Sequence, residues 1–332
     1  MGSLKIVASQ GDSGVSVKNR TESSRAHHIR RILILGHTGF IGGHLSEHLR
    51  RELPHVEIIG RSPASLDLTR EEDVRSIADF FDANTAVVML AAAKRQFGDN
   101  LDVYSRNMQM VINLCRLLQG RPVARLLYFS SAAVYGEDVH NTTITEATCV
   151  CPTSYYGAAK FAAECLLRKV FAAQPQSSLL VLRPPLIYGP GDRGETYGPS
   201  GFVRAAIRGA KITLWGDGAE LREFIFIEDL VRIVGQLIYH DTSGVVNVAS
   251  GVSHTFREAL DMVLSLALHQ QIEVDSRPRT KASVDNAFCN ARLIELLPQF
   301  LFTDLGSGIR RTYEKDLLAV TDVPAAGEGR QA

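Results

Sequence analysis

The sequence predicts an α/β fold, in which a doubly wound parallel sheet is followed by a smaller mixed α/β lobe towards the C-terminus. Apolar, strand-like runs alternate with amphipathic helical patterns over the first half of the chain, which is typical of a parallel sheet covered by helices on both faces. After Pro184 this rhythm breaks, because proline and glycine cluster through 184–201 and shorter elements follow. The second lobe is therefore expected to begin near this point.

Each expected element has its own signal. Short runs rich in aliphatic residues predict buried strands at 31–35, 56–60, 86–91, 124–130 and 178–183. Apolar residues that recur every three or four positions predict helices at 41–51, 71–80, 102–119, 154–173 and 255–268. From Phe226 to Tyr239 the pattern changes from a strand edge to a long helix. Residues 1–29 and 319–332 lack apolar periodicity and are expected to be flexible tails.

Composition narrows the class of protein. The 332 residues are 45% hydrophobic and 22% charged, so the chain can bury a large core. Its 36 basic and 36 acidic residues cancel, so neither a nucleic acid nor a membrane is expected as a partner. The N-terminus is polar, and no apolar run reaches the roughly 18 residues of a membrane span. Five scattered cysteines without zinc-like pairs indicate reduced thiols, no metal site and a cytoplasmic protein.

A glycine-rich turn joins the first strand to the first helix. It has the sequence Gly36-His37-Thr38-Gly39-Phe40-Ile41-Gly42 and follows the strand directly. Glycines let the backbone approach a pyrophosphate, while exposed N–H groups and the helix dipole favour its negative charge. The sequence therefore predicts a dinucleotide-binding Rossmann turn whose cofactor contacts are Gly36, Thr38, Gly39, Phe40, Ile41 and Gly42.

Two residues of the helix predicted at 154–173 form a candidate acid/base pair. Tyr156 and Lys160 are four positions apart, so their side chains share one helix face. A tyrosine hydroxyl ordinarily has a pKa of about 10, but a neighbouring ammonium and an oxidised nicotinamide both favour the phenolate. Ser131, just after the strand 124–130, can donate a hydrogen bond to a substrate oxygen. The alternative is a surface Tyr–Lys pair, which the glycine turn upstream argues against.

Together these motifs resemble the extended short-chain dehydrogenase/reductase family, in its nucleotide-sugar epimerase/dehydratase branch. The resemblance covers about residues 30–318, in a family-like order and spacing. Besides the glycine turn, it rests on Leu90-Ala-Ala-Ala93, Phe129-Ser-Ser-Ala-Ala-Val-Tyr-Gly136, Tyr156-Gly-Ala-Ala-Lys160, Arg183-Pro-Pro-Leu-Ile-Tyr-Gly-Pro-Gly-Asp-Arg193 and Leu214-Trp-Gly-Asp-Gly-Ala-Glu-Leu-Arg-Glu-Phe224. We expect an NAD(P)-binding Rossmann domain over 30–187, to which 225–250 returns, and a nucleotide-sugar lobe over 188–224 and 251–318.

The resemblance implies roles for individual residues. In the family the tyrosine is the acid/base, the lysine holds the nicotinamide ribose and the serine polarises the sugar oxygen, which places these roles on Tyr156, Lys160 and Ser131. Asn107 is expected to support the site, an ordinary helix asparagine being the alternative. Tyr156 is also expected to contact the cofactor, and further cofactor contacts are expected from Leu90, Ala91, Ala92 and Pro184.

The resemblance also implies a homodimer. The family usually dimerises through the helices expected here at 102–119 and 154–173. Their apolar content permits this contact, and it includes Met108, Val111, Leu114, Phe161 and Leu166.

The end of the second strand bears on the choice of cofactor. An NAD-preferring turn carries an Asp or Glu about 20 residues on, where it bonds the ribose hydroxyls. Here that place holds Gly60-Arg61-Ser62, and Arg61 offers a forked cationic donor suited to a 2′-phosphate. We therefore favour NADP over NAD, a solvated Arg61 being the alternative. Asp67 and Leu68 resemble the family's adenine-contacting pair, although Asp67 is alternatively a surface aspartate.

A nucleotide-diphosphate sugar is the expected substrate. Arg222 lies in a Gly-Asp-Gly-x-x-x-Arg pattern whose arginine binds the pyrophosphate in the family, and a guanidinium suits a diphosphate. The alternative is a salt bridge from Arg222 to Glu220 or Glu223. Lys94 and Arg193 are weaker candidates for substrate binding, beside Ser131 and Tyr156 at the reacting sugar.

Departures from the family pattern narrow the reaction. Family 4,6-dehydratases carry an Asp-Glu pair where this chain has Ala132 and Ala133, and a methyl group cannot transfer a proton. The cysteine at the Ala133 position and the histidine near Gly191 that fucose synthases use for 3,5-epimerisation are absent as well. The prediction that remains is NADP(H)-dependent 4-keto reduction of a nucleotide-linked deoxy sugar. NAD-dependent 4-epimerisation and a non-catalytic NADP(H)-binding module are the alternatives.

Overall fold

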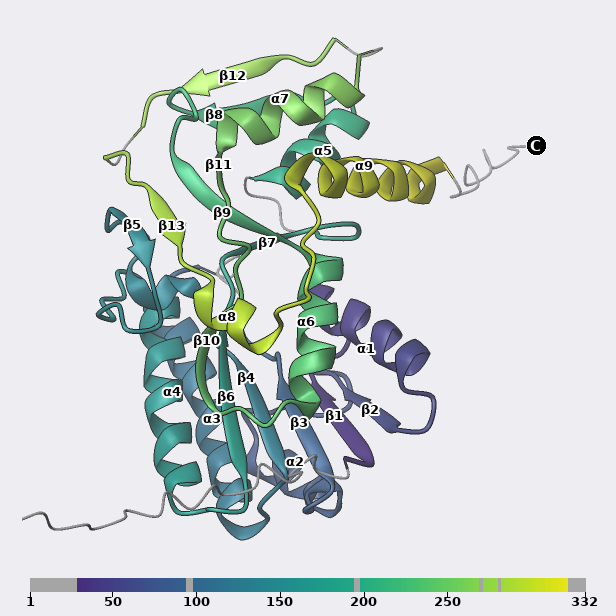
Figure 1. The fold of residues 1–332 in the computed structure, drawn as a ribbon, viewed down its shortest axis with the longest axis vertical. Helices are drawn as coiled ribbons and strands as arrows, with labels where there is room; N and C mark the ends of the chain where they lie inside the picture. The colour runs from purple at the N-terminus through teal and green to yellow at the C-terminus, as the bar shows by residue number, and fades with distance from the viewer. Residues whose placement is uncertain (1–28, 94–97, 194–197, 269–270, 280–281, 322–332) are drawn as a thin grey trace, which may run out of the picture.

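The computed structural model describes residues 29–93, 98–193, 198–268, 271–279 and 282–321. Figure 1 shows a sheet flanked by helices at one end of an elongated molecule and a smaller mixed lobe at the other. Most of the two predicted tails, 1–28 and 322–332, lies outside the described residues.

Strands and helices alternate along the chain in the predicted order. The first part contains β1 (Arg31–Leu35), α1 (Phe40–Glu52), β2 (Glu57–Arg61), α2 (Glu71–Ser76), η1 (Ala78–Phe80), β3 (Thr85–Met89), α3 (Leu101–Gly120), β4 (Arg125–Phe129), η3 (Ala132–Tyr135), β5 (Asn141–Ile144), α4 (Tyr155–Ala172) and β6 (Ser178–Arg183). The second part contains β7 (Leu186–Tyr188), α5 (Pro199–Ile207), β8 (Ile212–Trp215), β9 (Leu221–Phe226), α6 (Ile227–Tyr239), β10 (Gly244–Asn247), β11 (Ser253–Thr255), α7 (Phe256–Leu266), β12 (Val274–Arg277), β13 (Asn286–Phe288), α8 (Ala291–Leu296) and α9 (Leu305–Thr321).

A six-stranded sheet forms the body of the molecule, in the order β10-β6-β4-β3-β1-β2. Its strand pairs are parallel throughout. Because β1 lies between β2 and β3, the chain first adds β2 on one side of β1 and then crosses to add β3 and the later strands on its other side. The carboxyl ends of β1 and β3 are thus the switch point at which doubly wound sheets bind their ligands.

The central strands are buried on both faces, as their continuous apolar runs predicted. Along β1, Ile32 and Ile34 belong to one core cluster, whereas Leu33 and Leu35 belong to the other. This follows from the two-residue period of a strand, which sends successive side chains to opposite faces. α1 and α6 pack together over the first cluster, and α3 and α4 pack together over the second. The predicted doubly wound sheet is confirmed.

The smaller lobe stands over the carboxyl edge of this sheet (Figure 1). It contains a three-stranded sheet, β11-β9-β7, and the parallel pair β8 and β12. α5, α7 and α9 pack against one another beside these strands. After β9 the chain returns through α6, which packs on α1, and β10, which pairs with β6. The segment 225–250 therefore ties the lobe to the sheet.

Several boundaries differ from the prediction, most of them by one or two residues, and three of these differences have a clear cause or consequence. The helix expected over 71–80 ends at Ser76 and is followed by the 3₁₀ turn η1, which lets Phe81 enter the core. α9 continues to Thr321, past residue 318, because after Gly308 the chain has no further glycine or proline before Pro324. Ile29, expected in the tail, is buried. Within the described ranges, no helix combines the length and the apolar character that a membrane crossing needs.

Candidate active site

The glycine turn lies at the switch point, between β1 and α1. Gly36 has a φ of 98°, which other residues rarely adopt, and its N–H donates to the Arg61 carbonyl oxygen over 2.8 Å. Gly39 precedes α1 and offers no side chain to bond the first helical N–H groups. Thr38 and Gly39 are exposed, whereas Phe40 and Ile41 are half-buried. An approachable backbone at a helix N-terminus fits the pyrophosphate of a dinucleotide.

Gly42 is a position where this turn tolerates no side chain. A Cβ atom at Gly42 would lie 2.6 Å from the Cα of His37, whereas one at Gly43 would lie 3.9 Å from its nearest neighbour. We expect Gly42→Ala to separate α1 from the turn, to lower the free energy of unfolding by about 1–3 kcal/mol and to weaken dinucleotide binding. Urea unfolding and fluorescence titration with NADPH measure both effects. Gly43→Ala is the matched control, and equal losses in the two variants would contradict this account.

The carboxyl end of β3 lies against the other side of the turn. The N–H groups of Leu90 and Ala91 both donate to the Leu35 carbonyl oxygen, each over 2.9 Å. A Cβ atom at Gly36 would lie 2.9 Å from the Ala91 nitrogen. Leu90, Ala91 and Ala92 are half-buried beside the turn, where a dinucleotide would contact them.

Asn107, in α3, holds the segment that follows β3. Its Oδ1 accepts the Ala93 N–H over 2.8 Å, and its Nδ2 donates to the Ala93 carbonyl oxygen over 3.1 Å. Asn107 is buried, so this pair of bonds positions the backbone rather than a ligand. Lys94, the next residue and a predicted substrate contact, lies outside the described residues.

Arg61 ends β2 beside the glycine turn. Its guanidinium lies 4.9 Å from the centroid of the Phe80 ring and donates to the Gly60 carbonyl oxygen over 3.1 Å. Glu57, the acid of this strand, is at the other end of β2 and pairs with Arg31 over 2.7 Å. The end of β2 therefore carries a cation, Arg61, in the place where an NAD-binding turn has a carboxylate.

Asp67 and Leu68 lie in the loop after β2. The Asp67 Oδ1 accepts the Thr69 hydroxyl over 2.7 Å and the Thr69 N–H over 2.9 Å, and the first of these bonds does most to lower the Asp67 pKa. Leu68 is buried in the core, and its carbonyl oxygen accepts from Asn113 over 3.0 Å. These bonds shape the loop, and an adenine contact by the pair stays a prediction.

α4 begins at the predicted acid/base pair. Ser154 caps the helix, with its Oγ accepting the Gly157 N–H over 3.1 Å. The Tyr156 N–H donates to the Asp99 carboxylate, also over 3.1 Å. Tyr156 is half-buried and its neighbour Tyr155 is exposed. Two polar side chains thus fix the first turn of the helix, and with it the backbone that carries Tyr156.

Lys160 lies one helical turn after Tyr156 and is buried. Its Nζ is 5.7 Å from the centroid of the Tyr156 ring and donates to the Phe129 carbonyl oxygen over 2.7 Å. Burial lowers the pKa of Lys160 to about 8. The structure therefore brings the ammonium to the tyrosine ring, as their spacing predicted.

Ser131 follows β4 and caps η3. Its Oγ accepts the Ala133 N–H over 3.1 Å, and its side chain is half-buried. The next residue, Ala132, donates its N–H to the Pro184 carbonyl oxygen over 2.9 Å. Pro184 therefore anchors the segment that carries Ser131.

Behind the pair lies a buried polar network that the sequence analysis missed. Glu164 accepts two bonds from Arg183, over 2.9 and 2.6 Å, and one from Ser130 over 2.5 Å. Arg183 also donates to the Tyr135 hydroxyl over 2.8 Å. Glu164 follows Lys160 by one helical turn, which was the available signal. It also bonds Arg168 of the same helix, but its buried partner Arg183 is on a strand. The network fixes α4 against the ends of β4 and β6.

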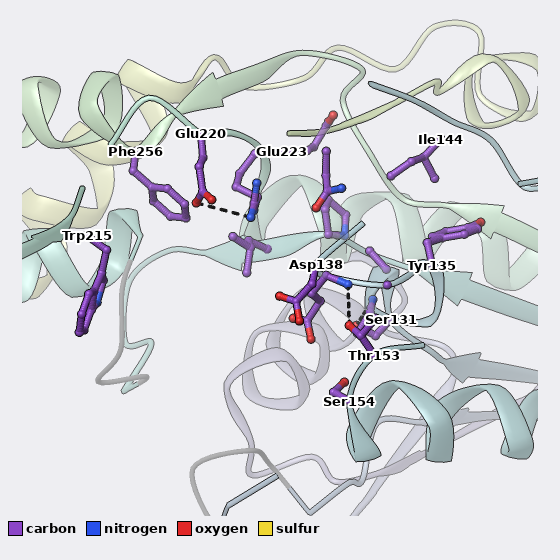
Figure 2. Close-up of a pocket in the computed structure, with 18 of the residues that line it drawn as sticks. Ser131, Tyr135, Asp138, Ile144, Thr153, Ser154, Trp215, Glu220, Glu223 and Phe256 are labelled. Atoms are coloured by element: carbon purple, nitrogen blue, oxygen red, sulfur yellow. Dashed lines mark hydrogen bonds and ion pairs between the residues drawn. The ribbon is translucent and has the colours of Figure 1, made fainter. Parts of the chain in front are cut away.

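A cavity of about 380 Å³ lies between the sheet and the smaller lobe. Figure 2 shows Ser131, Thr153 and Ser154 on the wall next to α4, and Trp215 and Phe256 on the wall from the lobe. Ala132 and Ala133 line it too, whereas Tyr156 is not among the lining residues. The cavity therefore extends from Ser131, next to the carboxyl edge of the sheet, to Trp215 and Phe256 of the smaller lobe.

Arg222 lines this cavity and also forms a salt bridge with Glu220, which was the predicted alternative to diphosphate binding. Its Nη2 is 3.5 Å from Glu220, while Glu223 bonds Ser250 instead. Arg279, which the sequence analysis missed, lines the same cavity and pairs with the other oxygen of Glu220. Arg279 and Glu220 are 59 residues apart in the chain, so no local pattern joined them. Two guanidinium groups thus share one buried carboxylate.

Two other expectations concern sites elsewhere. Arg193 is exposed and is not among the lining residues of the cavity, so its role in substrate binding stays a prediction. Among the residues that the structure describes, no group of three or more His, Cys, Asp or Glu side chains could hold a metal ion.

Comparison with known proteins shows the family. The model of the NAD dependent epimerase/dehydratase family matches residues 32–249. The chain is 27% identical to probable GDP-L-fucose synthase 1 of Oryza sativa subsp. japonica, over 70% of this chain and 76% of that protein. It is also 27% identical to dTDP-4-dehydro-6-deoxy-D-allose reductase of Streptomyces sp, over 75% of this chain and 85% of that protein.

A solved structure extends this likeness to the fold. The UDP-glucose 4-epimerase of Thermus thermophilus, in complex with NAD, superposes with a TM-score of 0.72 at 25% identity, over 86% of this chain and 98% of that one. Together with the Rossmann turn, these matches show that the chain belongs to the NAD-dependent epimerase/dehydratase family and is an enzyme that uses a nicotinamide cofactor.

Proposed function

We propose that the protein is an NADP(H)-dependent 4-ketoreductase of a nucleotide-linked deoxy sugar. The observation that carries this proposal is the end of β2, where Gly60 and Arg61 replace an acid. A carboxylate there would bond the ribose hydroxyls of NAD, whereas a guanidinium stacked on Phe80 is a donor for a 2′-phosphate. The likeness to a dTDP-4-dehydro-6-deoxy-D-allose reductase supports the same conclusion.

The substrate is proposed to lie along the cavity from Ser131 to Trp215. Ser131 is at the end where the sugar would react, and Arg222 and Arg279 lie where they can bind a diphosphate. Trp215 is 44% exposed on the cavity wall, so its ring offers a face on which a base can stack.

Three side chains perform the proposed chemistry. A reduced nicotinamide held by the glycine turn and Lys160 would provide the hydride that reduces C4 of the keto sugar. The Tyr156 hydroxyl gives its proton to the C4 oxygen, while Ser131 donates a hydrogen bond to that oxygen. The Lys160 ammonium, 5.7 Å from the ring centroid, stabilises the phenolate that remains on Tyr156.

Neighbouring residues restrict the reaction to this step. Ala132 and Ala133 line the cavity where a dehydratase of the family would place its acid/base pair. The likeness to a GDP-L-fucose synthase does not extend to a cysteine at Ala133 or a histidine near Gly191. The side chains with which those relatives are expected to expel water, or to move protons at C3 and C5, are therefore absent from these positions.

NAD-dependent 4-epimerisation is the second candidate, and the likeness to an NAD-bound UDP-glucose 4-epimerase favours it. It needs the same serine, tyrosine and lysine. The two candidates differ in whether cofactor is consumed. An epimerase returns its hydride to the sugar, whereas a reductase uses one NADPH for each product.

The test is the fate of the cofactor. Purified protein is denatured to identify any bound nucleotide, and NADPH oxidation is then followed with a panel of 4-keto and 4-hydroxy sugar nucleotides. The reductase proposal predicts one NADPH consumed per keto sugar reduced. Resident NAD with turnover that needs no added cofactor would refute it in favour of the epimerase. Tight NADPH binding without turnover of any sugar nucleotide would instead support the non-catalytic module.

The arginine pair provides a prediction about substrate affinity. Arg279→Gln and Arg222→Gln each remove one guanidinium from the proposed diphosphate site, so we expect KM for the sugar nucleotide to rise about 10- to 100-fold, with a smaller change in kcat. Arg277→Gln is the matched control, because Arg277 pairs with Asp275 and its side chain is 56% exposed. Steady-state kinetics with saturating NADPH measure the effect. An unchanged KM in both arginine variants would exclude this diphosphate site.

We also propose a homodimer through α3 and α4. The two helices pack together, and Leu166 is exposed beside the groove between them. Val111 and Leu114, which were expected to contribute, are buried in the core and are not available. Leu166→Glu is expected to shift the protein from dimer to monomer in light scattering at micromolar concentration. Leu301→Glu, at another exposed leucine, is the control, and a monomeric wild-type protein would contradict the proposal.

A further inference from the structure

The His37 imidazole occupies the space beside Gly60. A Cβ atom added at Gly60 would lie 2.5 Å from the His37 Cδ2 and 2.8 Å from its Cβ, and the three nearest atoms all belong to this one side chain. Gly60 is in β2, opposite Ile34 of β1, and the chain enters the glycine turn just beyond β1. The turn thus folds His37 back over the end of the neighbouring strand.

Glycine in a strand often marks the close approach of another group. Here the approaching group is a side chain of the cofactor-binding turn itself. The position that His37 covers is the end of β2, where dinucleotide-binding domains that use NAD carry the acid for the ribose hydroxyls. Any side chain at residue 60 would have to displace the ring before it could reach a ribose.

Packing holds the imidazole in place. The His37 N–H donates to the Arg61 carbonyl oxygen over 3.3 Å, which fixes the backbone beneath the ring. In the part of the chain that the structure describes, the buried Nδ1 of His37 has no hydrogen-bond partner. The imidazole therefore fills the space beside Gly60 by its size, and its Nδ1 makes no polar contact.

The residue after Gly60 favours the binding of an anion at the end of β2. The Arg61 guanidinium is held over Phe80, 4.9 Å from the ring centroid. Ser65 accepts the Ser62 N–H over 3.2 Å, so a hydroxyl lies at the start of the same loop. The end of β2 thus combines a cation with a blocked position for a carboxylate.

We infer that His37 and Gly60 are a coupled pair at the end of β2, in which the His37 imidazole occupies the space that the acidic side chain of an NAD-type site would need at position 60. This inference rests on the proposed preference for NADP(H). Arg61 is then the group that attracts a 2′-phosphate, and His37 is the barrier to converting the site to an NAD type by a substitution at position 60. The two positions 37 and 60 are coupled, because a carboxylate can be accommodated only after the imidazole is removed.

The experiment is a double-mutant cycle on the full chain with Gly60→Asp, His37→Gly and the double variant. Glycine is chosen at 37 because the His37 Cβ is itself within 2.8 Å of the new atom. Dissociation constants for NADPH and NADH are measured by calorimetric titration without substrate, and melting temperatures by calorimetry without cofactor. His55→Gly, in an exposed loop between α1 and β2, is the control for loss of a histidine elsewhere.

Gly60→Asp alone is expected to lower the melting temperature and to weaken NADPH binding without a gain for NADH. His37→Gly alone should change NADPH affinity by less than about threefold, since its effect is exclusion rather than contact. The double variant should recover the lost melting temperature and bind NADH about tenfold more tightly than either single variant. This non-additive gain is the signature of the proposed exclusion.

Two outcomes would overturn the inference. One is a Gly60→Asp protein that binds NADH about tenfold more tightly with an unchanged melting temperature. The other is a double variant that binds NADH no better than Gly60→Asp. Failure of the proposed function is separate and shows in the wild-type protein, which would then bind NADH at least as tightly as NADPH. The coupling between positions 37 and 60 is still measured in that case.

Discussion

Replacing Tyr156 with phenylalanine is expected to lower kcat by about 10²- to 10⁴-fold, the usual contribution of a positioned general acid. The change removes one hydroxyl and leaves the ring in contact with Lys160, so the fold and the cofactor affinity should stay close to those of the wild-type enzyme. Steady-state kinetics with the sugar nucleotide identified by the cofactor test, together with NADPH titration, measure both quantities.

Tyr155→Phe is the matched control for this experiment. Tyr155 is adjacent in α4 and is 47% exposed, so loss of its hydroxyl should leave kcat nearly unchanged. A Tyr156→Phe enzyme that keeps more than about half of its activity across pH 6 to 9 would show that another group is the proton donor.

Replacing Lys160 with methionine is expected to lower kcat about as strongly and, in addition, to weaken cofactor binding. Methionine keeps an unbranched side chain but removes the charge that faces Tyr156 and the bond to the Phe129 carbonyl oxygen. Lys169→Met, at an exposed position of the same helix, is the control. The cofactor affinity separates the two active-site variants, because Lys160 is expected to hold the nicotinamide ribose, and Tyr156→Phe leaves this ammonium in place.

The same variant tests the electrostatics of the buried ammonium. Burial lowers the pKa of Lys160 to about 8, from an ordinary value of 10.5. As the pH rises from about 8 to 10.5 the folded protein has lost this proton while the unfolded chain still holds it, so the contribution of Lys160 to stability increases. Below pH 8 the cost of burying the charge, on the order of 3 kcal/mol, is fully present.

The measurement is the difference in unfolding free energy between the wild-type cofactor-free protein and Lys160→Met at several pH values. This difference should shift in favour of the wild-type protein between pH 8 and pH 10.5 and should be constant between pH 6 and pH 7.5. Other titrating groups are common to both proteins and cancel. A difference that does not change between pH 8 and pH 10.5 would mean that burial does not lower the pKa of Lys160, and a difference that already changes between pH 6 and pH 7.5 would mean that Lys160 is uncharged at neutral pH in the folded state.

Local patterns in the sequence were sufficient for most of the Rossmann sheet. The run Ile32–Leu35 predicted β1, and the glycine turn after it predicted the start of α1 within one residue. The four-residue spacing of Tyr156 and Lys160 likewise predicted their contact, since a helix brings such residues onto one face. These features depend on the backbone period and on neighbours along the chain, which a single sequence displays directly.

Contacts between distant segments could not be predicted in this way. Arg222 was expected either at a diphosphate site or in a salt bridge with Glu220, and the structure shows that it lines the cavity and makes the salt bridge. Arg279 pairs with the same Glu220 carboxylate, although 59 positions separate the two residues in the sequence. Its Arg-Pro-Arg context carries no periodic signal. The chain path of the second lobe decides which side chains converge on Glu220.

By itself, then, the sequence determined the parallel sheet, the Rossmann turn and the proximity of Tyr156 and Lys160, because each follows from local geometry. Only the tertiary structure decided that His37 covers Gly60, that Glu164 pairs with Arg183 behind Lys160, and that Arg279 joins Arg222. The physical reason is that packing and charge pairing depend on distances through space. These distances are fixed only when segments far apart in the sequence pack against one another in the folded protein.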